Sequence, residues 1–253
     1  MLSAKPWRSE AVLQLIGAQL FCFCLAVMIA GLLGKAGLAA FQPPDGVGAA
    51  LLGMLGFQGA AWLLIWFFLR QHQVGWREAV GWRGPDLKKS LWLALGVLAF
   101  TLPAVWLLQI LSGAALDTLG MPVEKQRAVG VFLDIQSFWL RAVFGLVTVV
   151  IVPVAEEFVF RGILYPFVKQ LGSPRTAFFG VSAIFAAIHF DAGTFVPLFA
   201  LALILTRLYE KTDNLLAPIT AHSLFNAVNL VALCFLPQID EFLRKLLPPQ
   251  LLK

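Results

Sequence analysis

Residues 138–171 read FWLRAVFGLVTVVIVPVAEEFVFRGILYPFVKQL. This stretch is longer than the roughly 20 residues that an apolar helix needs to cross a bilayer. It nevertheless carries two adjacent glutamates, Glu156 and Glu157, followed by Arg161. Ionisable side chains inside a membrane are costly and therefore indicate a functional site by default. The stretch predicts a membrane-spanning helix that contributes to a polar site.

Composition extends this prediction to the whole chain. Of 253 residues, 60% are hydrophobic and only 13% are charged, and mean hydropathy is +0.84. A water-soluble fold of this length could not cover so much apolar surface. We therefore expect residues 1–253 to form a single membrane domain, an all-α polytopic protein with the lipid bilayer as its partner. The net charge of +5 contains no dense basic run, so a nucleic-acid partner is not expected.

About seven transmembrane helices are expected, with the site inside the C-terminal helical bundle. Residues 1–116 supply three charge-free spans, and residues 135–236 supply the other four. The expected spans are Ala11–Gly34, Gly46–Leu69, Ser90–Leu116, Phe138–Leu171, Pro174–Phe190, Gly193–Tyr209 and Asn214–Gln238. Residues 238–250 alternate apolar and charged positions at helical spacing, which predicts an amphipathic tail on the membrane surface.

The loop between the second and third spans predicts the orientation. Residues 70–89 carry five Lys or Arg residues against two acidic ones. Positive residues concentrate in cytoplasmic loops, so this loop and the N-terminus are expected on the cytoplasmic side of an integral membrane protein. The compact loops favour a bacterial plasma membrane.

The polar residues of the C-terminal half have spacings that place several on shared helix faces. Glu157 and Arg161 are four residues apart, with the acid first, which favours an ion pair on one helix. Glu156 is rotated by about 100° and points elsewhere. Pro153 is expected to kink the helix and to leave a backbone carbonyl without its usual donor.

Two histidines and an asparagine complete the candidate site. His189 lies near the end of the fifth expected span, and His222 and Asn226 lie four residues apart on the last. Hydrolysis suits this set, because a carboxylate in an apolar cavity holds a proton more readily than one in water. A histidine beside it can help hold a water, and a second histidine with an amide can donate to a developing oxyanion.

Other interpretations of these residues stay open. Each pair alone fits a structural role, as a buried ion pair, an interfacial histidine or an interhelical hydrogen bond. Glu156, His189 and His222 would also make a zinc set, although no HExxH motif is present. A proton-relaying transporter is disfavoured, since no internal repeat is visible. A non-catalytic membrane scaffold protein that binds a peptide in the same cavity is a further alternative.

Three short motifs in order resemble those of a known family. Glu156-Glu157-x-x-x-Arg161, Phe185-x-x-x-His189 and His222-x-x-x-Asn226 are similar to the three motifs of the CAAX protease and bacteriocin-processing family. The resemblance covers about residues 135–230 and excludes the first three spans.

This resemblance implies an intramembrane endopeptidase similar to the type II CAAX prenyl endopeptidase. It implies that Glu156 and His189 activate a water, that His222 and Asn226 form an oxyanion hole, and that Glu157 and Arg161 support the site. It further implies no cofactor and a membrane-associated peptide or protein substrate. Family members act in CAAX processing or in bacterial peptide processing, and the resemblance does not choose between them. It also leaves open a non-catalytic bacteriocin-immunity protein that binds a peptide in the same cavity.

The expected topology leaves His189 out of place. With the predicted spans, Glu156 and His222 lie toward the cytoplasmic side, whereas His189 comes 15 residues after Pro174, or about 22 Å along a helix. His189 would then lie too deep, unless the fifth helix begins outside the bilayer or residues 161–174 dip into it.

Overall fold

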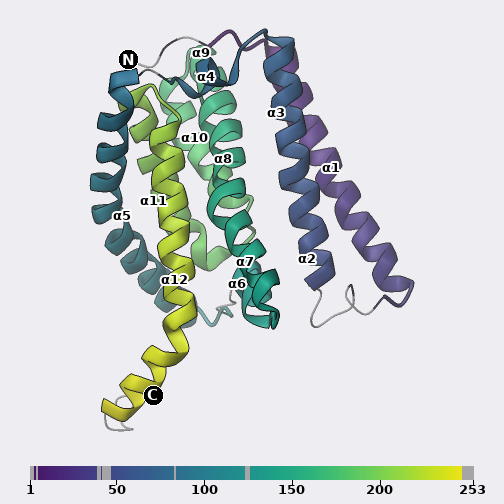
Figure 1. Ribbon diagram of the computed structural model, residues 1–253, viewed down its shortest axis with the longest axis vertical. Coiled ribbons are helices and arrows are strands. Elements are labelled where there is room, and N and C mark those ends of the chain that lie inside the picture. The colour runs from purple at the N-terminus through teal and green to yellow at the C-terminus, as the bar shows by residue number, and fades with distance from the viewer. Residues whose placement is uncertain are drawn as a thin grey trace.

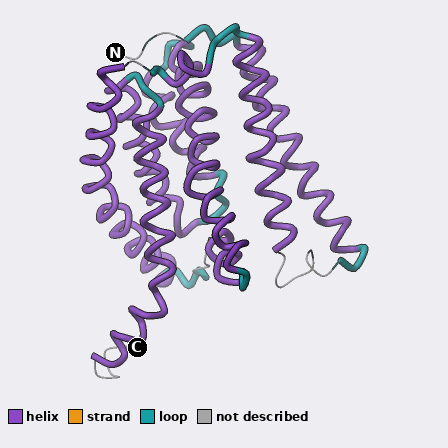
Figure 2. The backbone as a smooth tube through the Cα atoms, viewed as in Figure 1, coloured by secondary structure: helices purple, strands orange, loops and turns teal. Residues whose placement is uncertain are grey.

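Helices account for all the regular secondary structure in the described part of the chain (Figure 2). The computed structural model describes residues 3, 5–38, 41, 47–82, 84–122 and 126–246. Side chains are not described at residues 47, 50, 51, 55, 84–86, 127 and 236–246. The expectation of an all-α fold is confirmed for these residues.

The helices follow one another along the chain with short connections (Figure 1). The first half contains α1 (Ser9–Lys35), α2 (Val47–Met54), the π-helical turn η2 (Leu55–Gly59), α3 (Ala60–Gln71), α4 (Trp76–Val80), α5 (Gly84–Thr118) and α6 (Arg127–Asp134). The second half contains α7 (Phe138–Leu146), η3 (Val147–Ile151), α8 (Val152–Glu157), η4 (Phe158–Leu164), α9 (Tyr165–Gln170), α10 (Pro174–Ala187), α11 (Ala192–Thr212) and α12 (Leu216–Leu246).

Six helical runs in the described residues are long and apolar enough to cross a membrane. They are Ser9–Lys35, Leu52–Gln71, Leu87–Thr118, Phe138–Gln170, Ala192–Thr212 and Leu216–Phe235. Each corresponds to one of the seven expected spans. The remaining expected span is α10, whose 14 residues extend only about 21 Å, less than the roughly 30 Å hydrocarbon core of a bilayer. The expected number of spans is therefore approximately right, and the chain is an integral membrane protein.

The spans form two groups that meet at the helix carrying the glutamates. The long α5 packs against α11 and α12, and α10 packs against α9 and α11. The first span, α1, packs against α2 and α3, which belong to the second span. These two spans lie beside α8 at one edge of the bundle (Figure 1). The N-terminus, α4 and the α9–α10 turn share one end of the molecule, opposite the C-terminal end of α12 (Figure 1).

An N-terminal segment closes the end of the bundle at which α4 lies. The Trp7 indole donates to the Gly162 carbonyl at 2.8 Å, and the Gln170 amide donates to the Lys5 carbonyl at 3.0 Å. Nearby, Gly81 adopts φ +74° and approaches the backbone of Asp213 so closely that a Cβ at Gly81 would lie 2.4 Å from the Asp213 carbonyl oxygen. Residues far apart in the sequence therefore meet at the ends of α4, α9 and α11.

Two segments differ from their sequence-based description. Residues 127–134, which lie between the third and fourth expected spans, form α6. Its Phe132 and the following Ile135 pack against Phe144, and Arg141 donates to the Ile135 carbonyl at 2.6 Å. Most of the predicted tail continues α12 as far as Leu246, while residues 247–250 lie outside the described residues. Its location on the membrane surface stays a prediction.

Candidate active site

The glutamates lie between two π-helical turns of a single 33-residue helix, Phe138–Gln170. The turn η3 precedes α8, and η4 follows it. Such turns interrupt the α-helical hydrogen-bond pattern and are frequent at functional sites.

In η3, the Val152 amide donates to the Val147 carbonyl. The same five-residue register would pair residue 153 with the Thr148 carbonyl, but proline has no N–H. Pro153 thus leaves the Thr148 oxygen free, as its position in the sequence predicted.

Glu157, Arg161 and His222 form a buried hydrogen-bonded network. Oε1 of Glu157 accepts from Nη1 of Arg161 at 2.9 Å and from Nδ1 of His222 at 2.8 Å. Glu157 and Arg161 are 0% and 1% exposed, respectively. The i,i+4 spacing therefore produces the expected ion pair, and the network also joins this helix to α12.

Further contacts stabilise and orient the Arg161 guanidinium. It donates to the Ala202 carbonyl at 3.1 Å and to the Thr206 hydroxyl at 3.4 Å, both on α11. Its Cζ lies 4.5 Å from the centroid of the Phe185 ring on α10, a favourable cation–π geometry. Arg161 thus ties three helices together around the glutamate pair.

Glu156 shares His222 with Glu157 and has a second partner of its own in Gln58. Its Oε2 lies 3.9 Å from Nε2 of His222, and its Oε1 accepts from Nε2 of Gln58 at 3.4 Å. The first distance is too long for a direct hydrogen bond but allows one water to contact both groups. Glu156 and His222 are both nearly buried.

His189 reaches this cluster through Phe185. Its Nδ1 contacts the Phe185 carbonyl oxygen at 2.8 Å. The centroid of the Phe185 ring lies 5.1 Å from that of His189 and 5.9 Å from that of His222. Among the described residues, His189 makes no direct hydrogen bond to Glu156. The structure therefore places His189 beside the polar network and separates it from the network by an aromatic ring.

The structure brings His189 close to His222, with Phe185 in contact with both rings, despite the depth expected for His189. Glu156 lies 14 residues before the end of its helix at Gln170, about 21 Å along the axis. His189 lies 15 residues after Pro174, the start of the next, oppositely directed helix, about 22 Å along the axis. Measured from the α9–α10 turn, Glu156 and His189 therefore lie at similar distances along two neighbouring helices.

Asn226 lies one turn beyond His222 on α12 and binds the helix that carries the glutamates. Its Nδ2 donates to the Thr148 carbonyl at 3.0 Å, the oxygen that Pro153 leaves free. This bond uses one of the two amide hydrogens, so the other remains available for a ligand.

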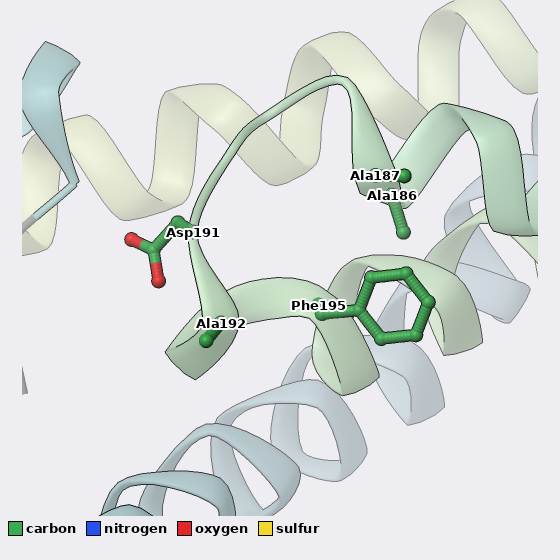
Figure 3. A pocket seen from close by; sticks show the side chains of 5 residues that line it. All are labelled: Ala186, Ala187, Asp191, Ala192 and Phe195. Carbon is green, nitrogen blue, oxygen red and sulfur yellow. The ribbon is translucent and has the colours of Figure 1, made fainter. Parts of the chain in front are cut away.

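A pocket of about 380 Å³ opens between the end of α10 and the start of α11. It is lined by Ala186, Ala187, Asp191, Ala192 and Phe195 (Figure 3). Asp191 caps α11 by accepting from the Thr194 amide at 3.1 Å. The lining residues come before and after His189 in the sequence, but none of the six predicted site residues lines the pocket.

The zinc alternative has no assembled ligand set among the described residues. That part of the chain contains no group of three or more His, Cys, Asp or Glu side chains that could hold a metal ion. His222 contacts Glu157 through Nδ1, and only its Nε2 faces Glu156.

Sequence reasoning missed Gln58, Phe185 as a contact residue, and Thr206. Gln58 comes from the spans that we considered uninformative, although an amide inside the apolar stretch 46–69 was a usable signal. Phe185 appeared only as a motif position, and Thr206 gave no signal because threonine bonds readily to its own helix, as Thr206 does to the Ala202 carbonyl at 2.8 Å.

Comparison with known proteins confirms the family resemblance. Residues 137–228 match the family described as type II CAAX prenyl endopeptidase Rce1-like. The chain is also 29% identical over 171 residues to the UPF0177 protein YxdF of Lactococcus lactis subsp. lactis (strain IL1403), covering 64% of this chain and 85% of that protein. No solved structure matches. The matched family is one of membrane proteases, and the match contains all six predicted site residues.

Proposed function

We propose that the protein is an intramembrane endopeptidase in which Glu156 activates a water for attack on a peptide carbonyl. The observation that carries the proposal is the pairing of Glu156 with His222 Nε2 across 3.9 Å, beside a buried Glu157–Arg161 pair. A water between the two groups would contact a base and a hydrogen-bond donor at once.

The charges of the four ionisable side chains at the site, Glu156, Glu157, Arg161 and His222, determine how many protons this mechanism starts with. Glu157 and Arg161 together are neutral. Glu156 and His222 are neutral as a pair when they hold one proton between them, either as carboxylate and imidazolium or as carboxylic acid and imidazole. A net charge in a low-dielectric site is costly, so the proposed mechanism starts from this neutral pair. Carboxylate with imidazolium is the form that can take a proton from water.

The reaction then proceeds with a balanced transfer of protons. Glu156 removes one proton from the water as its oxygen bonds to the peptide carbon. His222 Nε2–H and the second Asn226 amide hydrogen donate to the resulting oxyanion. When the carbon–nitrogen bond breaks, Glu156 gives its proton to the leaving amine. The family resemblance assigns His189 to holding the water with Glu156, but the Phe185 ring lies between His189 and the network, so no step of this mechanism depends on His189.

Glu157 and Arg161 position His222 rather than touch the substrate. Because the ionised Glu157 only accepts hydrogen bonds, its contact requires a hydrogen on His222 Nδ1. The imidazolium form then presents its remaining N–H to the substrate side, as an oxyanion donor must.

Reconstituted protein provides the direct test. We expect cleavage of peptides from a membrane-peptide library by the wild type, and loss of at least about a hundredfold in Glu156→Gln and His222→Ala, the usual scale for losing a base or an oxyanion donor. If the wild type and both variants were equally inert while binding of a peptide partner persisted, the non-catalytic immunity or scaffold role would replace the enzyme.

The cofactor and the substrate are part of the same proposal. The mechanism needs no metal, so activity is expected to survive a chelator such as EDTA. Loss of activity that zinc restores would favour the set Glu156, His189 and His222. The substrate class is a membrane-associated peptide or protein, and prenylated and unprenylated versions of one peptide would separate CAAX-type from general peptide processing.

The proposed location is a bacterial plasma membrane with the N-terminus in the cytoplasm. Support comes from Lys169 and Arg175, which flank the α9–α10 turn at the same end as the N-terminus and α4 (Figure 1). Labelling of single cysteines at residues 175 and 121 from either side of the membrane tests this orientation.

A further inference from the structure

Gln58 brings a polar group to Glu156 from a part of the chain that the family match does not include. It lies in η2, within the second span, and is 7% exposed. Its Nε2 donates to Glu156 Oε1 at 3.4 Å. Its Oε1 is buried and has no hydrogen-bond partner among the described residues.

The backbone around Gln58 is held from the side of α1. The Gln19 amide donates to the Phe57 carbonyl at 2.5 Å. Gly56 lies so close to α1 that a Cβ there would be 2.4 Å from Cβ of Ala26. Close approach and a hydrogen bond on adjacent residues fix where the Gln58 side chain begins.

A purely structural amide at this position would be poorly built. Burying an amide costs free energy unless both of its ends are bonded, and here the carbonyl end is not. The bonded end meets the side chain to which we assign the proton transfer. Because Gln58 Oε1 is unbonded, it can accept a hydrogen bond from Glu156 once Glu156 is protonated. An amide bonded at both ends could not do this.

We propose that Gln58 is a positioning residue that holds Glu156 in both of its protonation states. The amide N–H donates to the carboxylate before water attack. After Glu156 has taken the proton, a half-turn of the Gln58 terminal amide brings Oε1 to accept from the carboxylic acid. Gln58 itself neither gains nor loses a proton. This role rests on the proposed function of Glu156 as the base.

Gln58→Met tests the proposal, because methionine preserves the length of the side chain and removes both hydrogen-bonding groups. We expect kcat for a cleaved peptide to fall about tenfold, the scale of a long hydrogen bond to a charged group, while KM and the unfolding temperature change little. Gln58→Asn keeps the amide but shortens its reach by one carbon, so it should lose a similar factor even if Gln58→Met folds poorly.

Gln109→Met is the matched control. Gln109 is a partly buried glutamine of α5 that donates to the Gly193 carbonyl, also at 3.4 Å, and it does not contact Glu156. Its kcat should stay within about twofold of the wild type, since neutral hydrogen bonds contribute modestly.

The outcomes separate this inference from the proposed function. If the wild type cleaves, Glu156→Gln does not, and Gln58→Met and Gln58→Asn retain wild-type kcat, Gln58 has no positioning role. An equal loss in Gln109→Met, or a rise in KM without a fall in kcat, would also overturn it. If Glu156→Gln itself cleaves like the wild type, the proposed function fails first.

Discussion

Replacing Arg161 with methionine should destabilise the fold more than any surface change. The side chain is 1% exposed and donates to Glu157 at 2.9 Å, to Ala202 at 3.1 Å and to Thr206 at 3.4 Å. Each good hydrogen bond to a charged group contributes about 1.5–3 kcal/mol. Counting the two shorter ones gives about 3–6 kcal/mol, in line with the 3–5 kcal/mol typical of breaking a buried pair on one side.

Equilibrium unfolding in mixed micelles measures this loss, and Arg207→Met supplies a matched control. Arg207 also pairs with a glutamate on its own helix, Glu210, at 3.1 Å, but its side chain is 62% exposed. Exposed pairs contribute less than about 1 kcal/mol, so Arg207→Met should unfold almost like the wild type. A loss below about 1 kcal/mol in Arg161→Met, or equal losses in the two variants, would refute the idea that burial of the pair makes it essential.

Two other predictions concern the backbone. Gly81→Ala should destabilise the fold by more than about 2 kcal/mol. A left-handed φ alone costs about 1–2 kcal/mol, and the new Cβ would collide with the Asp213 carbonyl. The control is Gly75→Ala, where a Cβ meets nothing within 4 Å, and it should unfold as the wild type does. Pro153→Ala restores an N–H that competes for the Thr148 carbonyl, so peptide cleavage should fall about tenfold without loss of stability in the same unfolding assay. Unchanged cleavage would show that the free carbonyl does not position Asn226.

The spans and the Glu157–Arg161 pair could be predicted because each depends on local spacing. The apolar runs predict the spans, and the four-residue spacing predicts the contact of Arg161 with Glu157. Pro153 predicts a backbone carbonyl without its usual N–H donor. The place of His189 could not be predicted in this way. The helix that carries Glu156 ends at Gln170, one residue from the expected end at Leu171, but its packing beside α10 depends on contacts between helices and not on local spacing.

Contacts between distant parts of the chain were the other limit. Nothing in the sequence near Gln58 indicates that its partner is 98 residues away, and Phe185 gives no sign of stacking on a guanidinium. Such contacts depend on which span packs beside which, and apolar spans of similar length and hydropathy carry little information about their neighbours. The position of the Gln58 amide in an apolar span indicated that it has a polar partner, but not which residue that partner is.

Glu157→Gln separates the charge of Glu157 from its geometry. Only Oε1 of Glu157 accepts hydrogen bonds, and Oε2 has no partner among the described residues. A glutamine can therefore keep both acceptor contacts through its carbonyl oxygen, with its NH₂ in the place of Oε2. The substitution removes one negative charge and little else.

Charge balance then decides what happens to His222. With Glu157 neutralised, the Glu156 carboxylate and the Arg161 guanidinium already balance, so the cluster is neutral without a proton on His222 Nε2. The fold should lose less stability than in Arg161→Met, whereas kcat should fall by about 10²–10³, the effect of losing one oxyanion donor. Steady-state cleavage and unfolding of the two variants test this contrast. If Glu157→Gln cleaved like the wild type, the imidazolium form of His222 would not be the donor, because the charge that holds its second proton would be gone while every hydrogen bond to Nδ1 remained.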